Sequence, residues 1–218
     1  RDFVLSWTPE ARSTPSSALF TQQHDGYQYG LVMTLPPSSE ALQQSAIDRE
    51  VIYILDTSGS MSGESIEQAK QALIFGLEQM GENDTFNIIE FNSYAHKLWH
   101  NSQFATRAHK NEAIQYINGL EANGGTEILP ALEMALTNQP PQWANEQSRL
   151  RQVLFLTDGS VGNEAELMQF IKGHLQQSRL FTIGIGSAPN SYFMSEAARV
   201  GKGAYTYIGA VSQVRDKM

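Results

Sequence analysis

The chain has 218 residues, of which 41% are hydrophobic and 17% charged, and this globular composition excludes the disordered and fibrous classes. Its formal net charge is −8, and because no cluster of basic residues follows a helix or stripe, we expect it not to bind nucleic acid or anionic membranes. The sequence contains no Cys, which excludes disulfides, thiolate metal sites and cysteine nucleophiles. No apolar run approaches the ~20 residues of a membrane span. It begins at Arg1 rather than Met, so we expect a fragment of a longer protein.

The first 45 residues show the two-residue alternation that is typical of half-buried antiparallel strands. Apolar side chains alternate with other residues over Phe3–Trp7 and again over Tyr27–Leu35. A polar segment rich in Ser, Thr, Gln and Pro connects these two predicted strands, and Pro36–Ser39 is typical of a linker. We therefore predict a short antiparallel β segment over residues 1–45 and a second domain over residues 46–218.

The second domain alternates between short, continuously apolar runs and longer runs with helical spacing. The β-branched run Val51–Leu55 fits a strand that helices cover on both faces, and Ile66–Met80 follows it with apolar residues at helical spacing. Further strands are predicted at residues 86–91, 95–99 (antiparallel), 153–156, 180–185 and 204–208, and further helices at 107–120, 126–137, 167–175 and 192–200. This order predicts a Rossmann-like α/β fold, with a doubly wound, mostly parallel sheet, one antiparallel strand and helices on both faces.

Three polar segments meet at the carboxyl edge of this predicted sheet, where doubly wound folds bind their ligands. Asp56, Ser58 and Ser60 directly follow the first strand of the domain. Thr126 begins a predicted helix after two glycines, and Asp158 follows a later parallel strand. All five side chains offer oxygen, which favours Mg²⁺, or else Mn²⁺ or Ca²⁺, over zinc or copper. If the two acids act through water, they leave a divalent ion only partly neutralised, and such a site would attract a carboxylate from another molecule.

The two aspartates could instead serve only as helix caps and turn residues, which is a common role for Asp. Each segment taken alone would favour that interpretation. The convergence of three polar segments at one edge of the sheet favours the metal site.

These residues resemble a known family. The sequence Asp56-Thr57-Ser58-Gly59-Ser60 is similar to the DxSxS motif of von Willebrand factor type A domains, and Thr126 and Asp158 match the other two motifs in order. The resemblance implies a complete metal-ion-dependent adhesion site, with direct coordination by the two serines and direct or water-mediated coordination by Thr126. It implies mainly water-mediated roles for Asp56 and Asp158.

A narrower resemblance is to bacterial relatives of inter-alpha-trypsin inhibitor heavy chains, through Asp2–Leu5 and Leu31–Pro36. It implies that the β-rich segment belongs to a truncated flanking domain and that the parent protein lies outside the cell or at the cell envelope. We expect the function to be the capture of a partner protein's Asp or Glu side chain by the bound ion. Specificity would come from the surrounding loops Met61–Glu64, Glu127 and Val161–Glu164.

Two alternatives remain. The same site would suit an intracellular type A module that serves an ATPase-coupled complex. A metal-dependent phosphatase is an alternative from the enzyme class, because an aspartyl phosphatase also carries its nucleophilic Asp at the end of the first strand. Such phosphatases resemble this layout but have a second Asp two residues later, where this chain has Ser58. We therefore expect that the protein is not an enzyme.

Overall fold

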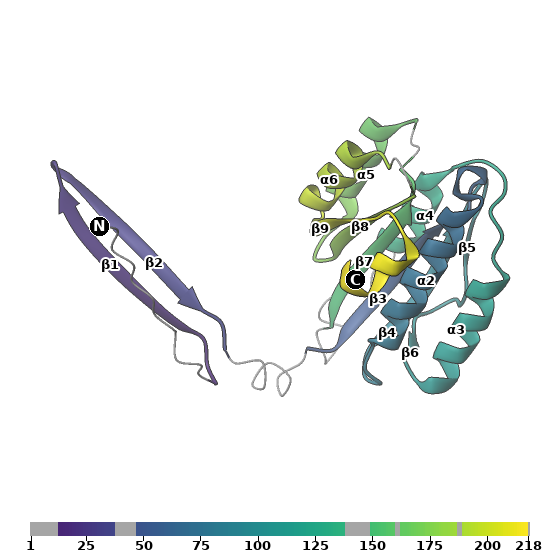
Figure 1. Ribbon diagram of the computed structural model, residues 1–218, viewed down its shortest axis with the longest axis horizontal. Coiled ribbons are helices and arrows are strands. Elements are labelled where there is room, and N and C mark those ends of the chain that lie inside the picture. The colour runs from purple at the N-terminus through teal and green to yellow at the C-terminus, as the bar shows by residue number, and fades with distance from the viewer. Residues whose placement is uncertain (1–12, 38–46, 138–148, 160–161, 187–188, 218) are drawn as a thin grey trace. The chain divides into compact units, whose positions relative to one another are not determined.

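The computed structural model describes residues 13–37, 47–137, 149–159, 162–186 and 189–217. The chain divides into two units, Arg1–Ile47 and Asp48–Met218, and Figure 1 shows the hairpin of the first and the α/β sheet of the second. The strand predicted at Phe3–Trp7 lies outside the described residues. No helix among those described is long and apolar enough to cross a membrane.

The first unit contains an antiparallel hairpin of β1 (Ser16–His24) and β2 (Tyr27–Leu35). Asp25 and Gly26 join the strands with φ angles of 50° and 79°, the positive values that a two-residue hairpin turn requires. The antiparallel β segment is confirmed, but the prediction that β1 is a polar connection was wrong. Its adjacent apolar residues Leu19 and Phe20 hide the alternation on which the prediction depended. The hairpin side chains are also mostly exposed rather than half-buried.

The second unit is built on a sheet with the strand order β5-β4-β3-β7-β8-β9. Its parallel strands are β3 (Arg49–Asp56), β4 (Thr85–Phe91), β7 (Leu150–Thr157), β8 (Arg179–Ile185) and β9 (Lys202–Ile208). The short β5 (Ala95–Lys97) pairs antiparallel with β4, as predicted, and the two-residue β6 (Gln103–Phe104) does so as well. A strand as short as β6 leaves no periodicity in the sequence. The predicted α/β fold is confirmed.

Helices cover both faces of this sheet. They are α2 (Glu64–Glu78), α3 (Arg107–Gly119), α4 (Ile128–Leu136), α5 (Glu164–His174), α6 (Ser191–Val200) and α7 (Val214–Lys217), with 3₁₀ turns η1 (Gly59–Met61) and η3 (Val211–Gln213). Alternate residues of β3 belong to two apolar clusters: Tyr53 packs in the cluster that includes α2 and α3, and Ile54 in the one that includes α4, α5 and α6. This explains why β3 is apolar at every position from Val51 to Leu55.

The strand order reverses between β3 and β7. From β3 the chain first moves outward to β4 and later returns to continue through β7, β8 and β9 on the other side. A switch of this kind leaves space beyond the carboxyl ends of the two central strands, because their connections leave in opposite directions. These ends are Asp56 and Thr157, so the fold places the predicted polar segments at this edge.

Candidate metal centre

The carboxylate of Asp56 joins the ends of the two central strands. Asp56 is the buried last residue of β3, and its Oδ1 accepts a hydrogen bond from the amide of Ser58 at 2.8 Å. Its Oδ2 accepts one from the hydroxyl of Thr157, the last residue of β7, at 2.6 Å. Hydrogen bonds to a carboxylate are stronger than those between neutral groups, so they fix the loop after β3 against the end of β7.

The two serines of the loop after β3 lie side by side. Their hydroxyl oxygens, Oγ of Ser58 and Oγ of Ser60, are 3.0 Å apart. Ser58 is the extended N-cap of the 3₁₀ turn Gly59–Met61, and Ser60 lies within that turn. Ser58 is buried and Ser60 is exposed, so the pair lies where the protein interior meets solvent.

Thr126 is held near this loop through the backbone. The carbonyl of Gly124 accepts a hydrogen bond from the amide of Gly59 at 3.1 Å, and the amide of Asn123 donates to the carbonyl of Thr57 at 2.8 Å. Thr126 is half-buried and precedes Glu127, the N-cap of α4. The helix therefore begins two residues later than predicted, because Pro130 stands in its first turn and the two glycines extend the loop.

Asp158 completes the predicted set. It follows β7 directly and is half-buried, and its backbone carbonyl accepts a hydrogen bond from the amide of Asn190 at 3.3 Å. Its charge lies close enough to Asp56 to act on that carboxylate. The structure thus joins Asp56, Ser58 and Ser60 by direct hydrogen bonds and places Asp158 within electrostatic reach of Asp56.

The electrostatics of this edge favour a cation. Burial raises the pKa of Asp56 above its usual value, and the negative charge of Asp158 adds to this effect. The hydrogen bonds from Ser58 and Thr157 act in the opposite direction but do not outweigh burial. A bound cation would stabilise the ionised form of this carboxylate.

The donor atoms fit a hard divalent ion. Within the described ranges, no three His, Cys, Asp or Glu side chains gather as a metal site, so an ion at this edge would depend on hydroxyl oxygens as well. Two carboxylates and three hydroxyls supply only oxygen, which is the ligand type that Mg²⁺, Mn²⁺ and Ca²⁺ prefer.

The prediction that Met61 belongs to the loops that determine specificity was wrong. Met61 is completely buried in the apolar cluster under α2 and cannot contact a partner. Glu127 is exposed, as a contact residue must be, and Glu164 is half-buried and accepts a hydrogen bond from the side chain of Asn190 at 2.6 Å. Val161 lies outside the described residues.

Sequence reasoning missed three residues that contribute to this edge: Thr157, which holds Asp56, and Asn92 and Ser93, which hold the segment around Thr126. A signal was present for all three. Asn92 and Ser93 directly follow the predicted strand at 86–91, and Thr157 follows the one at 153–156. The carboxyl ends of parallel strands share one edge of a sheet, so polar residues there belong to the same neighbourhood.

The chain is similar in sequence to known proteins that are several times longer. The chain is 34% identical over 193 residues to a von Willebrand factor A domain-containing protein of Dictyostelium discoideum, with 87% of this chain and 20% of that protein covered. It is 32% identical over 165 residues to inter alpha-trypsin inhibitor, heavy chain 4 of Mus musculus, with 70% and 17% covered. The chain thus spans about a fifth of the length of these curated relatives.

Solved structures share the fold at low sequence identity. A von Willebrand factor type A protein from Catenulispora acidiphila superposes with a TM-score of 0.69 at 18% identity and covers 94% of this chain and 45% of its own. Two others hold metals. Proximal thread matrix protein 1 from the mussel byssus, with a zinc-occupied MIDAS motif, has a TM-score of 0.58 at 16% identity, covering 78% and 46%. Manganese-loaded TRAP protein of Plasmodium vivax has a TM-score of 0.60 at 19% identity, covering 77% and 71%.

The family assignment rests on most of the second unit. Residues 49–207 match the von Willebrand factor type A domain, a range that begins at β3 and ends within β9. It contains all or most of every strand of the sheet described above, and all five predicted ligands. The chain therefore belongs to the von Willebrand factor type A domain family.

Proposed function

We propose that the second unit binds one divalent cation, Mg²⁺ or else Mn²⁺ or Ca²⁺, and through it captures an Asp or Glu side chain of a partner protein. The ligands would be Asp56, Ser58, Ser60, Thr126 and Asp158. The observation that carries this proposal is the pair of serine hydroxyls 3.0 Å apart, on a loop that hydrogen bonds join to Thr157 and to Gly124. The metal-loaded structures of the mussel and Plasmodium proteins support it.

The residues would have different roles. Ser60 is exposed, so its side of the site is open to a partner. Both oxygens of Asp56 already accept hydrogen bonds within the protein, which suits this carboxylate to act through an ordered water rather than directly. When bound, the ion supplies an electrophilic centre to which an external carboxylate oxygen can bind.

The charge of the surface around the site indicates which kind of partner could bind there. Glu64 and Glu127 are exposed near its rim, and the chain carries a formal net charge of −8. These charges repel an acidic surface, so the anchoring acid should be surrounded by basic residues that compensate for them. In keeping with the resemblance to inter-alpha-trypsin inhibitor heavy chains, we propose that the protein acts at the cell envelope or outside the cell, and without catalysis.

Calorimetric titration tests the metal site. Mg²⁺, Mn²⁺, Ca²⁺ and Zn²⁺ are titrated into chelator-stripped protein, into the Ser58→Ala/Ser60→Ala double variant and into Ser62→Ala. Ser62 is a matched control, because its hydroxyl donates to the carbonyl of Gly59 at 2.8 Å in the same loop but is not a proposed ligand. We expect one-to-one binding that Ser62→Ala retains and that the double variant loses by at least tenfold. Equal affinity in all three proteins, or no binding to any, would contradict the proposal.

Carboxylate capture has a separate readout. With Mn²⁺ bound, acetate should displace an exchangeable water and lower the enhancement of water-proton relaxation, whereas acetamide, which lacks the charge, should not. If acetate leaves the relaxation of the Mn²⁺ complex unchanged, the ion is bound but does not capture a carboxylate.

A further inference from the structure

We propose that Ser93 is a positioning residue that fixes Thr126 for metal binding, and this inference rests on the metal site proposed above. Ser93 lies in the turn Asn92–Tyr94 between β4 and β5, outside the three motifs that match the family. Its side chain holds the peptide group between Gly124 and Gly125, close to Thr126 in the same loop.

The turn holds Thr126 from both sides. The amide of Gly125, the residue before Thr126, donates a hydrogen bond to Oγ of Ser93 at 2.8 Å. The amide of Glu127, the residue after it, donates to the backbone carbonyl of Asn92 at 2.7 Å. Two consecutive residues of one turn therefore hold the Gly124–Gly125 peptide, which lies one residue before the threonine's own, and the Thr126–Glu127 peptide directly after it.

The turn is itself joined to the loop that carries the serines. The side-chain amide of Asn92 lies 3.4 Å from the hydroxyl of Thr57 and 3.3 Å from the side-chain oxygen of Asn123. The backbone amide of Thr57 in turn donates a hydrogen bond to the carbonyl of Phe91 at 2.8 Å. The position of Thr126 relative to Ser58 thus depends on the turn, because Thr57 precedes Ser58 directly.

The packing around Ser93 leaves little room for another arrangement. Gly124 has a φ of +74°, and a Cβ added to it would lie 3.0 Å from Oγ of Ser93. A Cβ on Gly125 would lie 3.3 Å from the same atom. Because the two residues before Thr126 are glycines, the backbone can approach Ser93 closely. The Ser93 hydroxyl can then accept a hydrogen bond from the amide of Gly125.

Of the two contacts, only that of Ser93 depends on a side chain. Removing the hydroxyl leaves the amide of Gly125 at an exposed position, where water can satisfy it. Water does not hold the loop in one place. A substitution at Ser93 is therefore expected to change metal affinity more than it changes stability, which is the signature of a positioning role.

The test is a double-mutant cycle with Mg²⁺ as the probe. Dissociation constants are measured by calorimetry for the unmodified chain, Ser93→Ala, Thr126→Ala and the double variant. We expect Ser93→Ala to weaken Mg²⁺ binding about tenfold, as loss of an outer-shell partner does, and to have no further effect once Thr126 is Ala. Ser93→Thr, which keeps the hydroxyl, should restore affinity to within threefold.

Ser102→Ala is the matched control. Its hydroxyl donates to Glu50 at 2.7 Å, near the amino end of β3 and far along the strand from the site, so its loss should leave Mg²⁺ affinity unchanged. If the melting temperature of the Ser93→Ala variant is well below that of Ser102→Ala, the cycle is repeated with Ser93→Cys. A cysteine side chain is close in size to serine, but its sulfur is a weak hydrogen-bond acceptor.

The outcomes separate two failures. Unchanged affinity in Ser93→Ala, or an equal loss with and without the Thr126 hydroxyl, overturns the role of Ser93 while the metal site stands. Absence of Mg²⁺ binding in the unmodified chain overturns the metal site itself and this inference with it.

Discussion

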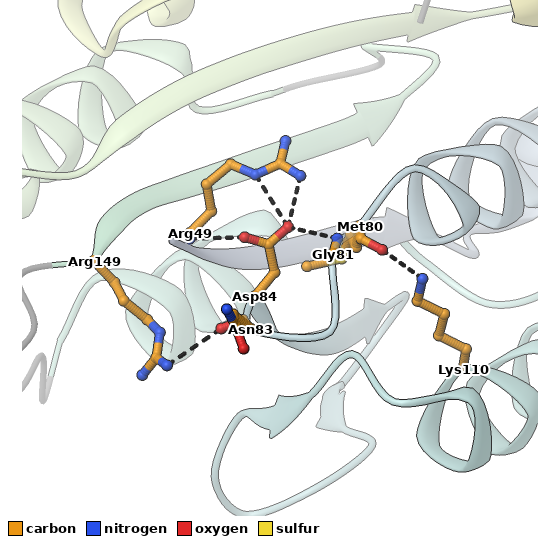
Figure 2. Close-up of polar contacts among 7 residues, drawn as sticks. All are labelled: Arg49, Met80, Gly81, Asn83, Asp84, Lys110 and Arg149. Carbon is orange, nitrogen blue, oxygen red and sulfur yellow. Dashed lines mark hydrogen bonds and ion pairs between the residues drawn. The ribbon is translucent and has the colours of Figure 1, made fainter. Parts of the chain in front are cut away.

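Asp84 shows what a single carboxylate contributes away from the candidate metal centre. This buried residue precedes β4 and accepts hydrogen bonds from the backbone amide of Arg49 at 2.8 Å, from its guanidinium at 3.2 and 2.6 Å, and from the amide of Gly81 at 2.9 Å (Figure 2). Burial acts to raise the pKa of Asp84, but the hydrogen bonds and the charge of Arg49 outweigh it and hold the pKa below its usual value.

We expect Asp84→Asn to lower the free energy of unfolding by about 2–3 kcal/mol near neutral pH, because it removes charge-assisted hydrogen bonds. The folded-state pKa is lowered, so the contribution is complete above the unfolded value of ~3.9 and is lost as pH falls through the folded value. Urea denaturation from pH 7 to pH 3 should show a difference that is constant down to about pH 5 and shrinks below about pH 4. Glu78→Gln, at an exposed position of α2, should show no such difference, and a pH-independent cost for Asp84→Asn would refute the ionic explanation.

Single residues differ in how far sequence can predict them. Asp56, Ser58 and Ser60 follow a continuously apolar strand, so their place at the sheet edge follows from local pattern. Ser93 contacts Gly125 across 32 residues of sequence, and no local pattern contains that pairing. Met61 looked like a loop residue but is buried, because the 3₁₀ turn directs it under α2.

At the scale of elements, the long strands of the sheet could be predicted because helices cover both faces and favour short, mostly apolar runs such as Val51–Leu55. Helix ends were less predictable. The helix α4 begins at Ile128 after Glu127, whose side chain makes no capping hydrogen bond, whereas Thr126 is the residue whose chemistry suggests a cap. The strand β1 could not be predicted because its exposed faces impose no apolar alternation.

Two glycines in regular elements should respond oppositely to Ala. A Cβ on Gly203 in β9 would lie 2.1 Å from the backbone carbonyl oxygen of Leu180 on the neighbouring strand, whereas nothing lies within 4 Å of one on Gly173 in α5. We expect Gly203→Ala to destabilise the fold by about 2–3 kcal/mol through overpacking and Gly173→Ala to stabilise it by roughly 0.5–1 kcal/mol through helix propensity. Chemical denaturation measures both, and a neutral Gly203→Ala would show that β9 can move away from β8 at little cost.

At the scale of the whole chain, the two units differ in what holds them together. The unit Asp48–Met218 contains two apolar clusters on opposite faces of its sheet. In the hairpin, Phe20 pairs with Leu31 on the same face as Tyr29, and these side chains are 55%, 59% and 56% exposed. A two-stranded hairpin with an uncovered apolar face is at best marginally stable in water.

We therefore expect the two units to separate when cut. A chain of residues 48–218 should unfold cooperatively, with a Tm within a few degrees of the 218-residue chain and an unchanged Kd for Mg²⁺, because its core and all five proposed ligands lie within it. A peptide of residues 13–37 should show little β structure by circular dichroism, since it has no covered apolar face. If the shortened chain instead melts much earlier or binds Mg²⁺ more weakly, the hairpin stabilises the α/β unit. Its exposed apolar residues would then be explained by that interaction.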